Sequence, residues 1–198
     1  MQHMTDQILE HAGRRPEGAP IAAKALLHLG SRAAVDQALS RLVRRGTLLR
    51  AGRGLYVRPV KGRFGVRAPG IEQLLEAVAI QSGEVVAPSG AAAASALGFT
   101  TQIPIRSVYL TSGRSRKLML GNQTIELRHA PRWQLALAGR PAGEAVRALA
   151  WLGPEQAEAA MTALKRKLPP SALQELVAAV PQLPAWLART ISQAAAYA

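Results

Sequence analysis

Six arginines lie close together in the segment RLVRRGTLLRAGRGLYVRP, residues 41–59, and the segment contains no acidic residue. Guanidinium groups form paired hydrogen bonds with phosphate oxygens and with the edge of guanine. Apolar residues are interspersed with these arginines, and two glycines precede the run Leu55, Tyr56 and Val57. A folded segment that presents cations in this way is suited to bind a polyanion.

The basic charge is concentrated in the first third of the chain. The formal net charge is +13 and the isoelectric point is about 11.4. Residues 1–68 contain 13 Lys and Arg but only four Asp and Glu, whereas residues 69–130 contain five and four. Such a balance favours DNA, RNA or an anionic membrane as the partner, or reflects an arginine-rich proteome. The uneven distribution favours a localised binding surface.

Other features of the composition narrow the class of protein. The chain has no cysteine, which excludes disulfides and thiolate metal sites. No stretch reaches the roughly 18 apolar residues of a membrane span, and acidic residues interrupt the N-terminus where a signal peptide would lie. We therefore expect a cytoplasmic protein with no membrane partner.

The elements around the arginine-rich segment predict a winged helix-turn-helix. We expect a helix capped by Thr5, a second over Ile21–Leu29, and a third over Arg32–Arg45 that is capped by Ser31 and stopped by Gly46. Strands are expected over Thr47–Arg50 and Leu55–Arg58, around a glycine turn. Three helices followed by a hairpin is the element order of a winged helix-turn-helix. In that fold the third helix enters the major groove of DNA.

The third helix has two distinct faces. The apolar residues Val35, Ala38, Leu39 and Leu42 recur at helical spacing, so they predict the buried stripe. The opposite face collects Ala33, Gln37, Ser40, Arg41 and Arg44. This face is polar near its start and cationic toward its end.

Side chains on these elements have specific candidate roles on DNA. Gln37 suits adenine, and Arg32 or Arg41 suits guanine, although an ion pair with Asp36 competes for Arg32. Phosphate contact or insertion into the minor groove is expected from the hairpin arginines, and phosphate contact from the N-terminus of the helix. The candidate DNA-binding residues are Ser31, Arg32, Gln37, Ser40, Arg41, Arg44, Arg50, Arg53 and Arg58. The alternatives are that these arginines are only solvated, or that the domain docks RNA or protein.

The rest of the chain predicts an α+β fold with a helical C-terminal part. Residues 61–70 are basic and rich in Gly and Pro, so we expect a linker between a domain at 1–60 and one at 71–198. Helices are expected over Ile71–Ser82, after Ser89, and at about 142–152, 155–167, 171–180 and 184–196. Strands are expected at 84–87 and 106–112, with a hairpin at 117–127.

Few residues outside the first domain suggest chemistry. Ser89 and His129 could form a hydrolase pair, but Ser89 before an alanine-rich run is better explained as a helix cap. A second basic site is considered at Arg114, Arg116 and Lys117, against the alternative of a solvated hairpin. The four histidines lack metal-binding spacing, and Trp133, Trp151 and Trp186 are expected in the core. We expect no catalytic residue, metal or cofactor.

Three stretches of the chain resemble a known family. They are SRAAVDQALSRLVRRGTLLRAGRGLYVRP, VVAPSGAAAASALGFTTQIP and VYLTSGRSRKLMLGNQTIELRHAP, and they follow one another within residues 30–131. Together they resemble the AbiEi-type antitoxins of bacterial abortive-infection (type IV) toxin–antitoxin systems. The segment with PSG before the alanine run, followed by TSGRSR, is more specific than the winged helix.

The resemblance implies a function that residue spacing does not. Such antitoxins repress their own operon by binding inverted repeats, and they neutralise a toxin of nucleotidyltransferase-like fold. By this resemblance, Ser31–Arg45 is the recognition helix and Arg50–Arg58 the wing, while the C-terminal region serves antitoxicity. The implied partners are double-stranded operator DNA, bound by two copies, and the cognate toxin, met directly or opposed without stable contact. The alternative is an interaction module for RNA or toxin without operator-specific repression.

Overall fold

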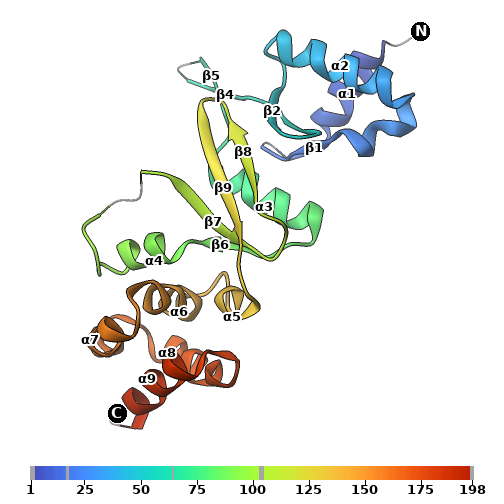
Figure 1. The fold of residues 1–198 in the computed structure, drawn as a ribbon. Coiled ribbons are helices and arrows are strands. Elements are labelled where there is room, and N and C mark those ends of the chain that lie inside the picture. The colour runs from blue at the N-terminus through green and yellow to red at the C-terminus, as the bar shows by residue number, and fades with distance from the viewer. Residues whose placement is uncertain (1–2, 17, 64, 103–104, 197–198) are drawn as a thin grey trace. The chain divides into compact units, whose positions relative to one another are not determined.

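Helices and short strands alternate along the chain in the computed structural model, which describes residues 3–16, 18–63, 65–102 and 105–196 (Figure 1). Their contacts divide the chain into two compact units. The first unit comprises Met1–Glu84 and Lys117–Ile125, and the second comprises Val85–Arg116 and Glu126–Ala198. The expectation of a mixed α+β fold with a helical C-terminal part is confirmed.

The first unit begins with helices around a small sheet. Three antiparallel strands lie in the order β1-β3-β2, and a core of buried apolar side chains joins them to the helices. The bounds are α1 Met4–Gly13, β1 Ile21–Ala22, η1 Ala23–Leu29, α2 Arg32–Arg44, β2 Leu49–Gly52 and β3 Leu55–Val57. The core residues are Ile8, Ala12, Ile21, Ala23, Leu26, Val35, Ala38, Leu39, Leu42, Leu48 and Tyr56.

Two expectations for this region are wrong in detail. Thr5 does not cap the first helix, because helical geometry begins at Met4 with His3 as the N-cap. The second expected helix divides instead into strand β1 and the 3₁₀ helix η1, because Ile21 and Ala22 pair with residues of β3. Ala23, Leu26 and Leu29 face the core at a spacing of three, which matches the period of a 3₁₀ helix.

The expected linker at residues 61–70 contains a second hairpin. Strands β4 Val60–Gly62 and β5 Gly65–Arg67 pair antiparallel, with Gly62 opposite Gly65. The side chain of Val60, at the start of this hairpin, is buried, although the charge of the segment suggested a solvated connector. Phe64, which falls in the expected linker, lies outside the described residues. The next helix, α3 Ile71–Ser82, has the expected bounds.

After α3 the chain forms the strands β6 to β9, with the short helix α4 between β6 and β7. The expected strands and hairpin are present as β6 Val86–Pro88, β7 Ser107–Thr111, β8 Arg116–Leu120 and β9 Gln123–His129. They belong to a sheet of order β6-β7-β9-β8. Ser89 caps α4 Gly90–Ala96, because its Oγ accepts a hydrogen bond of 3.4 Å from the Ala92 N–H.

The C-terminal part of the second unit is a helical assembly. The four expected helices are present, and the structure adds the short elements α5 and η2. The bounds are α5 Arg132–Leu135, α6 Pro141–Leu152, α7 Pro154–Lys167, α8 Pro170–Ala178, η2 Val180–Gln182 and α9 Ala185–Ala196. Trp133 and Trp186 pack against the shared core of these helices as expected. The expectation is wrong for Trp151, which is 47% exposed.

One charged side chain is buried in this assembly. Arg147 on α6 is 1% exposed, and its Nη1 lies 3.5 Å from the carbonyl oxygen of Gln134. Burial lowers the pKa of its guanidinium, and the nearby carboxylate of Glu144 opposes that shift.

Among the described residues, no helix has the length and apolar character needed to span a membrane.

Candidate nucleic-acid interface

Helix α2 has strong signals at both ends, so its position is well defined. At its start, the Ser31 Oγ accepts a hydrogen bond of 3.3 Å from the Ala34 N–H. At its end, Gly46 adopts a φ of 70°, which L side chains rarely adopt. The Gly46 and Thr47 N–H groups then donate to the carbonyls of Val43 and Leu42, closing the helix with a Schellman motif. These hydrogen bonds therefore fix the end of α2, from which the chain continues toward strand β2.

The two expected faces of α2 are confirmed. Val35, Ala38, Leu39 and Leu42 are buried to at least 96%. Gln37, Ser40, Arg41 and Arg44 are all exposed. Among the described residues these four have no ion-pair or side-chain hydrogen-bond partner, so their polar groups are available to a ligand.

The start of α2 is less available than its later turns. Arg32 forms an ion pair with Asp36, with its Nε 2.8 Å from the Asp36 Oδ2. The competition expected for Arg32 is thus present in the structure. Both side chains are about half exposed, so the pair is weak and a phosphate or base could displace it. Ser31 uses its hydroxyl in the cap, which leaves the hydroxyl proton for another acceptor.

The arginines of the hairpin β2–β3 do not form one group. Arg53 is exposed in the turn, beside Gly54 with its φ of 67°. The Arg50 Nε donates to the Gly52 carbonyl at 3.3 Å, so this guanidinium leans along the strand toward the turn. Arg58 follows the far end of β3, and its Nη1 lies 3.7 Å from where a Cβ on Gly13 would be, at the end of α1. Arg50 and Arg53 therefore lie near the turn, and Arg58 lies at the base of the hairpin.

The residues of the second basic site have different environments. Arg114 and Lys117 are exposed, whereas Arg116 is half-buried and donates from Nη1 to the Arg114 carbonyl at 3.1 Å. Arg116 and Lys117 begin strand β8. The carbonyl of Arg114 is thus engaged by Arg116 within the segment, while the Arg114 side chain is exposed.

Ser89 and His129 are each engaged in local structure. The Ser89 hydroxyl accepts the capping hydrogen bond of α4. The His129 Nδ1 lies 2.9 Å from the Gly113 carbonyl oxygen, and its backbone N–H donates to the Ser115 hydroxyl. In the part of the chain that the structure describes, no three His, Cys, Asp or Glu side chains are grouped to hold a metal ion.

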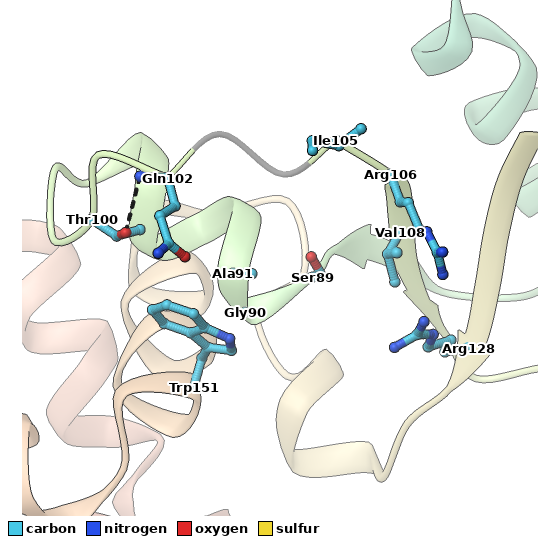
Figure 2. A pocket seen from close by; sticks show the side chains of 10 residues that line it. All are labelled: Ser89, Gly90, Ala91, Thr100, Gln102, Ile105, Arg106, Val108, Arg128 and Trp151. Atoms are coloured by element: carbon cyan, nitrogen blue, oxygen red, sulfur yellow. Dashed lines mark hydrogen bonds between the residues drawn. The ribbon is translucent and has the colours of Figure 1, made fainter. Parts of the chain in front are cut away.

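Sequence reasoning missed two features with functional potential. Arg45, the C-cap of α2, is exposed and continues the cationic end of that helix. Trp151 lines a cavity in the second unit together with Arg106 and Arg128 (Figure 2). Helical periodicity could have indicated the exposure of Trp151, because it lies two residues after the buried Leu149 and thus on the other face.

Comparison with known proteins gives a family match. The model of a family of unknown function (DUF6088) matches residues 7–169, which include both helix α2 and the residues that line the cavity at Trp151. No curated protein and no solved structure matches the chain. Because the family model covers most of its length, the chain belongs to the DUF6088 family.

Proposed function

We propose that the first unit is a winged helix-turn-helix that binds double-stranded DNA, with α2 as the recognition helix and β2–β3 as the wing. The observation that carries the proposal is the exposed face of α2, where Gln37, Ser40, Arg41 and Arg44 stand without partners among the described residues. The order α1, η1, α2, β2, β3 supports it, as does the small sheet that joins β1 to the hairpin. A helix presented in this way fits the width of the major groove.

Each exposed side chain has a distinct task in this proposal. The Gln37 amide pairs with adenine and the Arg41 guanidinium pairs with guanine, each through two hydrogen bonds. Arg44 and the wing residue Arg53 neutralise phosphates or, for Arg53, enter a narrow minor groove. Arg32 contacts DNA only after its ion pair with Asp36 has broken. The free energy that it contributes to DNA binding is therefore reduced by the cost of breaking that pair. Arg58, beside α1, is the least suited of the set.

The biological role that we propose is that of an antitoxin and autoregulator in the cytoplasm. It rests on the resemblance of residues 30–131 to the AbiEi-type antitoxins. In this role the protein represses its own toxin–antitoxin operon by binding inverted repeats, with two copies on the operator. It also neutralises a nucleotidyltransferase-like toxin, for which the second unit is the candidate, and it has no enzymatic activity of its own.

The first test is binding to the DNA upstream of the protein's own gene. Fluorescence anisotropy at two salt concentrations would compare this duplex with a scrambled duplex. We expect the native duplex to bind more tightly and to give two shifted species in a gel. Arg41→Ala should cost about 1–3 kcal/mol on the native duplex only, since a base contact is lost.

A second variant separates base contacts from phosphate contacts. Arg53→Ala should weaken binding to both duplexes and reduce the slope of log affinity against log salt by about one. Arg189→Ala removes the same charge from an exposed position on α9 and serves as the matched control. Equal binding to both duplexes, or equal loss in all three variants, would reject the operator proposal and direct the search to RNA.

A further inference from the structure

The second unit contains a cavity whose lining is unlike that of a structural void. Its volume is about 450 Å³, within the range of about 300–1,000 Å³ typical of ligand sites. The lining comes from Ser89, Gly90 and Ala91, from Thr100, Gln102, Ile105, Arg106 and Val108, from Arg128 on β9, and from Trp151 at the end of α6 (Figure 2). Trp151, a large apolar side chain that is 47% exposed to solvent, belongs to this lining together with Arg106 and Arg128. Exposed apolar surface and cations thus occur in the lining of one cavity.

The indole of Trp151 provides a flat apolar surface within this cavity. α6 buries Ala142, Ala145, Val146 and Leu149 against its neighbours, whereas Trp151 projects from a different face and is 47% exposed. The base of this side chain lies close to the backbone of Gly90, because a Cβ on Gly90 would lie 2.7 Å from the Trp151 Cβ. An exposed indole is suited to stack on an aromatic ring.

Two guanidinium groups lie on the other side of the cavity. Figure 2 shows the side chains of Arg106 and Arg128 directed toward one another, with Ser89 between them and the indole. Arg106 is exposed and has no ion-pair or hydrogen-bond partner among the described residues. Arg128 donates to the Glu126 carboxylate at 2.7 and 3.1 Å. One carboxylate against two guanidinium groups leaves a net positive charge, which favours an anion.

Polar groups near the indole add hydrogen-bonding capacity. Gln102 and Thr100 line the cavity, and the Gln102 backbone N–H donates to the Thr100 hydroxyl at 3.1 Å. The side-chain amide of Gln102 is exposed in this cavity and carries both donors and an acceptor. Such an amide can pair with the edge of a heterocycle that is stacked on the indole.

We propose that this cavity binds a nucleoside phosphate, with the base on Trp151 and the phosphate at Arg106 and Arg128. A simple anion would leave the indole without a use, and an apolar ligand would leave the guanidinium groups without one. A flat heterocycle joined to an anion satisfies both. The same chemistry is offered by a free nucleotide and by the 5′-phosphorylated end of a single strand. The proposal does not depend on duplex binding by the first unit.

Calorimetric titration of the full-length protein tests the proposal. The probes are AMP, UMP, adenosine, inorganic phosphate, and a short oligouridine with either a 5′-phosphate or a 5′-hydroxyl. We expect AMP and UMP to bind, and adenosine and phosphate alone to bind much more weakly. Tighter binding of the 5′-phosphorylated strand than of UMP, with loss in the 5′-hydroxyl strand, would identify a strand end as the ligand. Equal binding of UMP and that strand would identify the free nucleotide.

Variants distinguish this site from general charge attraction. Arg106→Ala removes an exposed side chain without partners among the described residues, so the fold is retained, and it should weaken AMP binding about tenfold. Trp151→Ala should weaken it by about tenfold or more through lost stacking, with circular dichroism as the check on folding. Arg166→Ala, an exposed arginine on α7, should change it by less than about twofold. Duplex binding should be the same in all three variants.

Two results would overturn the proposal. The first is that neither the nucleotides nor the 5′-phosphorylated strand binds in the millimolar range. The second is that Arg106→Ala and Arg166→Ala weaken AMP binding equally, which would assign the affinity to overall positive charge.

Discussion

The imidazole of His11 on α1 is placed where a positive charge is unfavourable. Its Nε2 is buried without a hydrogen-bond partner in the described structure, and its ring centroid lies 6.1 Å from that of His28. Burial lowers the pKa of His11 below the ordinary value of 6.5, and the charges of Arg15, His28 and Arg14 add to this effect. The folded protein therefore favours the neutral imidazole more strongly than the unfolded chain does.

This histidine makes stability depend on pH in a defined direction. Below pH 6.5 the unfolded chain binds a proton at His11 that the folded chain binds less readily, so the free energy of unfolding falls as the pH falls. The contribution is fully present above pH 6.5. Urea unfolding of wild type and His11→Phe at pH 7.5 and pH 5.5 measures it. We expect a smaller loss between these pH values in the variant, and an equal loss in both proteins would contradict this.

Residues of one type differ in their availability, and the sequence shows this only in part. The arginines of residues 32–58 look alike in the sequence, yet Arg41 and Arg53 stand free among the described residues while Arg32 is paired and Arg58 lies beside α1. The Arg32 pair could be predicted because its partner is four residues away on the same helix. The place of Arg58 depends on packing between α1 and the end of β3, which no local pattern encodes.

At the scale of elements, α4 and α6 approach each other closely because Gly90 has no side chain. A Cβ at Gly90 would lie 2.7 Å from both the Arg147 carbonyl oxygen and the Trp151 Cβ. One of these neighbours is backbone and cannot rotate away. The two helices also share a core of small residues, Ala93, Ala94 and Ala148, which permits this short separation.

Gly90→Ala should therefore push the two helices apart. We expect the free energy of unfolding to fall by about 1–3 kcal/mol, as in other overpacked sites. Trp151 should become more mobile and its fluorescence spectrum should shift. Gly139→Ala is the matched control in the same unit, because a Cβ there would meet nothing within 4 Å. Equal stability of the two variants would show that α6 can shift at little cost.

Elements with strong local signals were predictable, and those that depend on distant pairing were not. α2 has a serine cap, a heptad-spaced apolar stripe and a terminal glycine, and its bounds agree with the sequence to within one residue. The prolines at 154 and 170 likewise mark the starts of α7 and α8. By contrast, β1 exists because Ile21 and Ala22 pair with β3, more than 30 residues away. The hairpin β4–β5 was not predicted, because the charges of this segment suggested a solvated linker.

At the scale of the molecule, the first unit is assembled from two separate parts of the sequence. Residues Lys117–Ile125 belong with Met1–Glu84. Within this unit the Leu118 Cδ2 lies 3.3 Å from where a Cβ on Gly52 of β2 would be, and Leu118 is 3% exposed. A contiguous N-terminal domain that ends near residue 60 would lack this contact.

A fragment of residues 1–84 should therefore be less stable than a version that retains the second part. Residues 117–125 joined to its C-terminus through a glycine-serine linker provide the comparison. We expect the shorter fragment to unfold at a lower urea concentration, because the side of β2 that Leu118 covers is left open to water. Circular dichroism measures both transitions. Coincident transitions would show that residues 117–125 add nothing to this unit.

The discontinuity of the first unit also sets an order of events during synthesis. On the ribosome, residues 1–84 emerge before residues 117–125. The contact between β2 and Leu118 therefore cannot form until the 32 intervening residues have been translated. During that interval the nascent chain exposes apolar surface that the finished protein covers. A translational pause within this interval would lengthen its exposure to chaperones and proteases. We therefore expect codon usage between these two parts of the gene to influence the yield of folded protein.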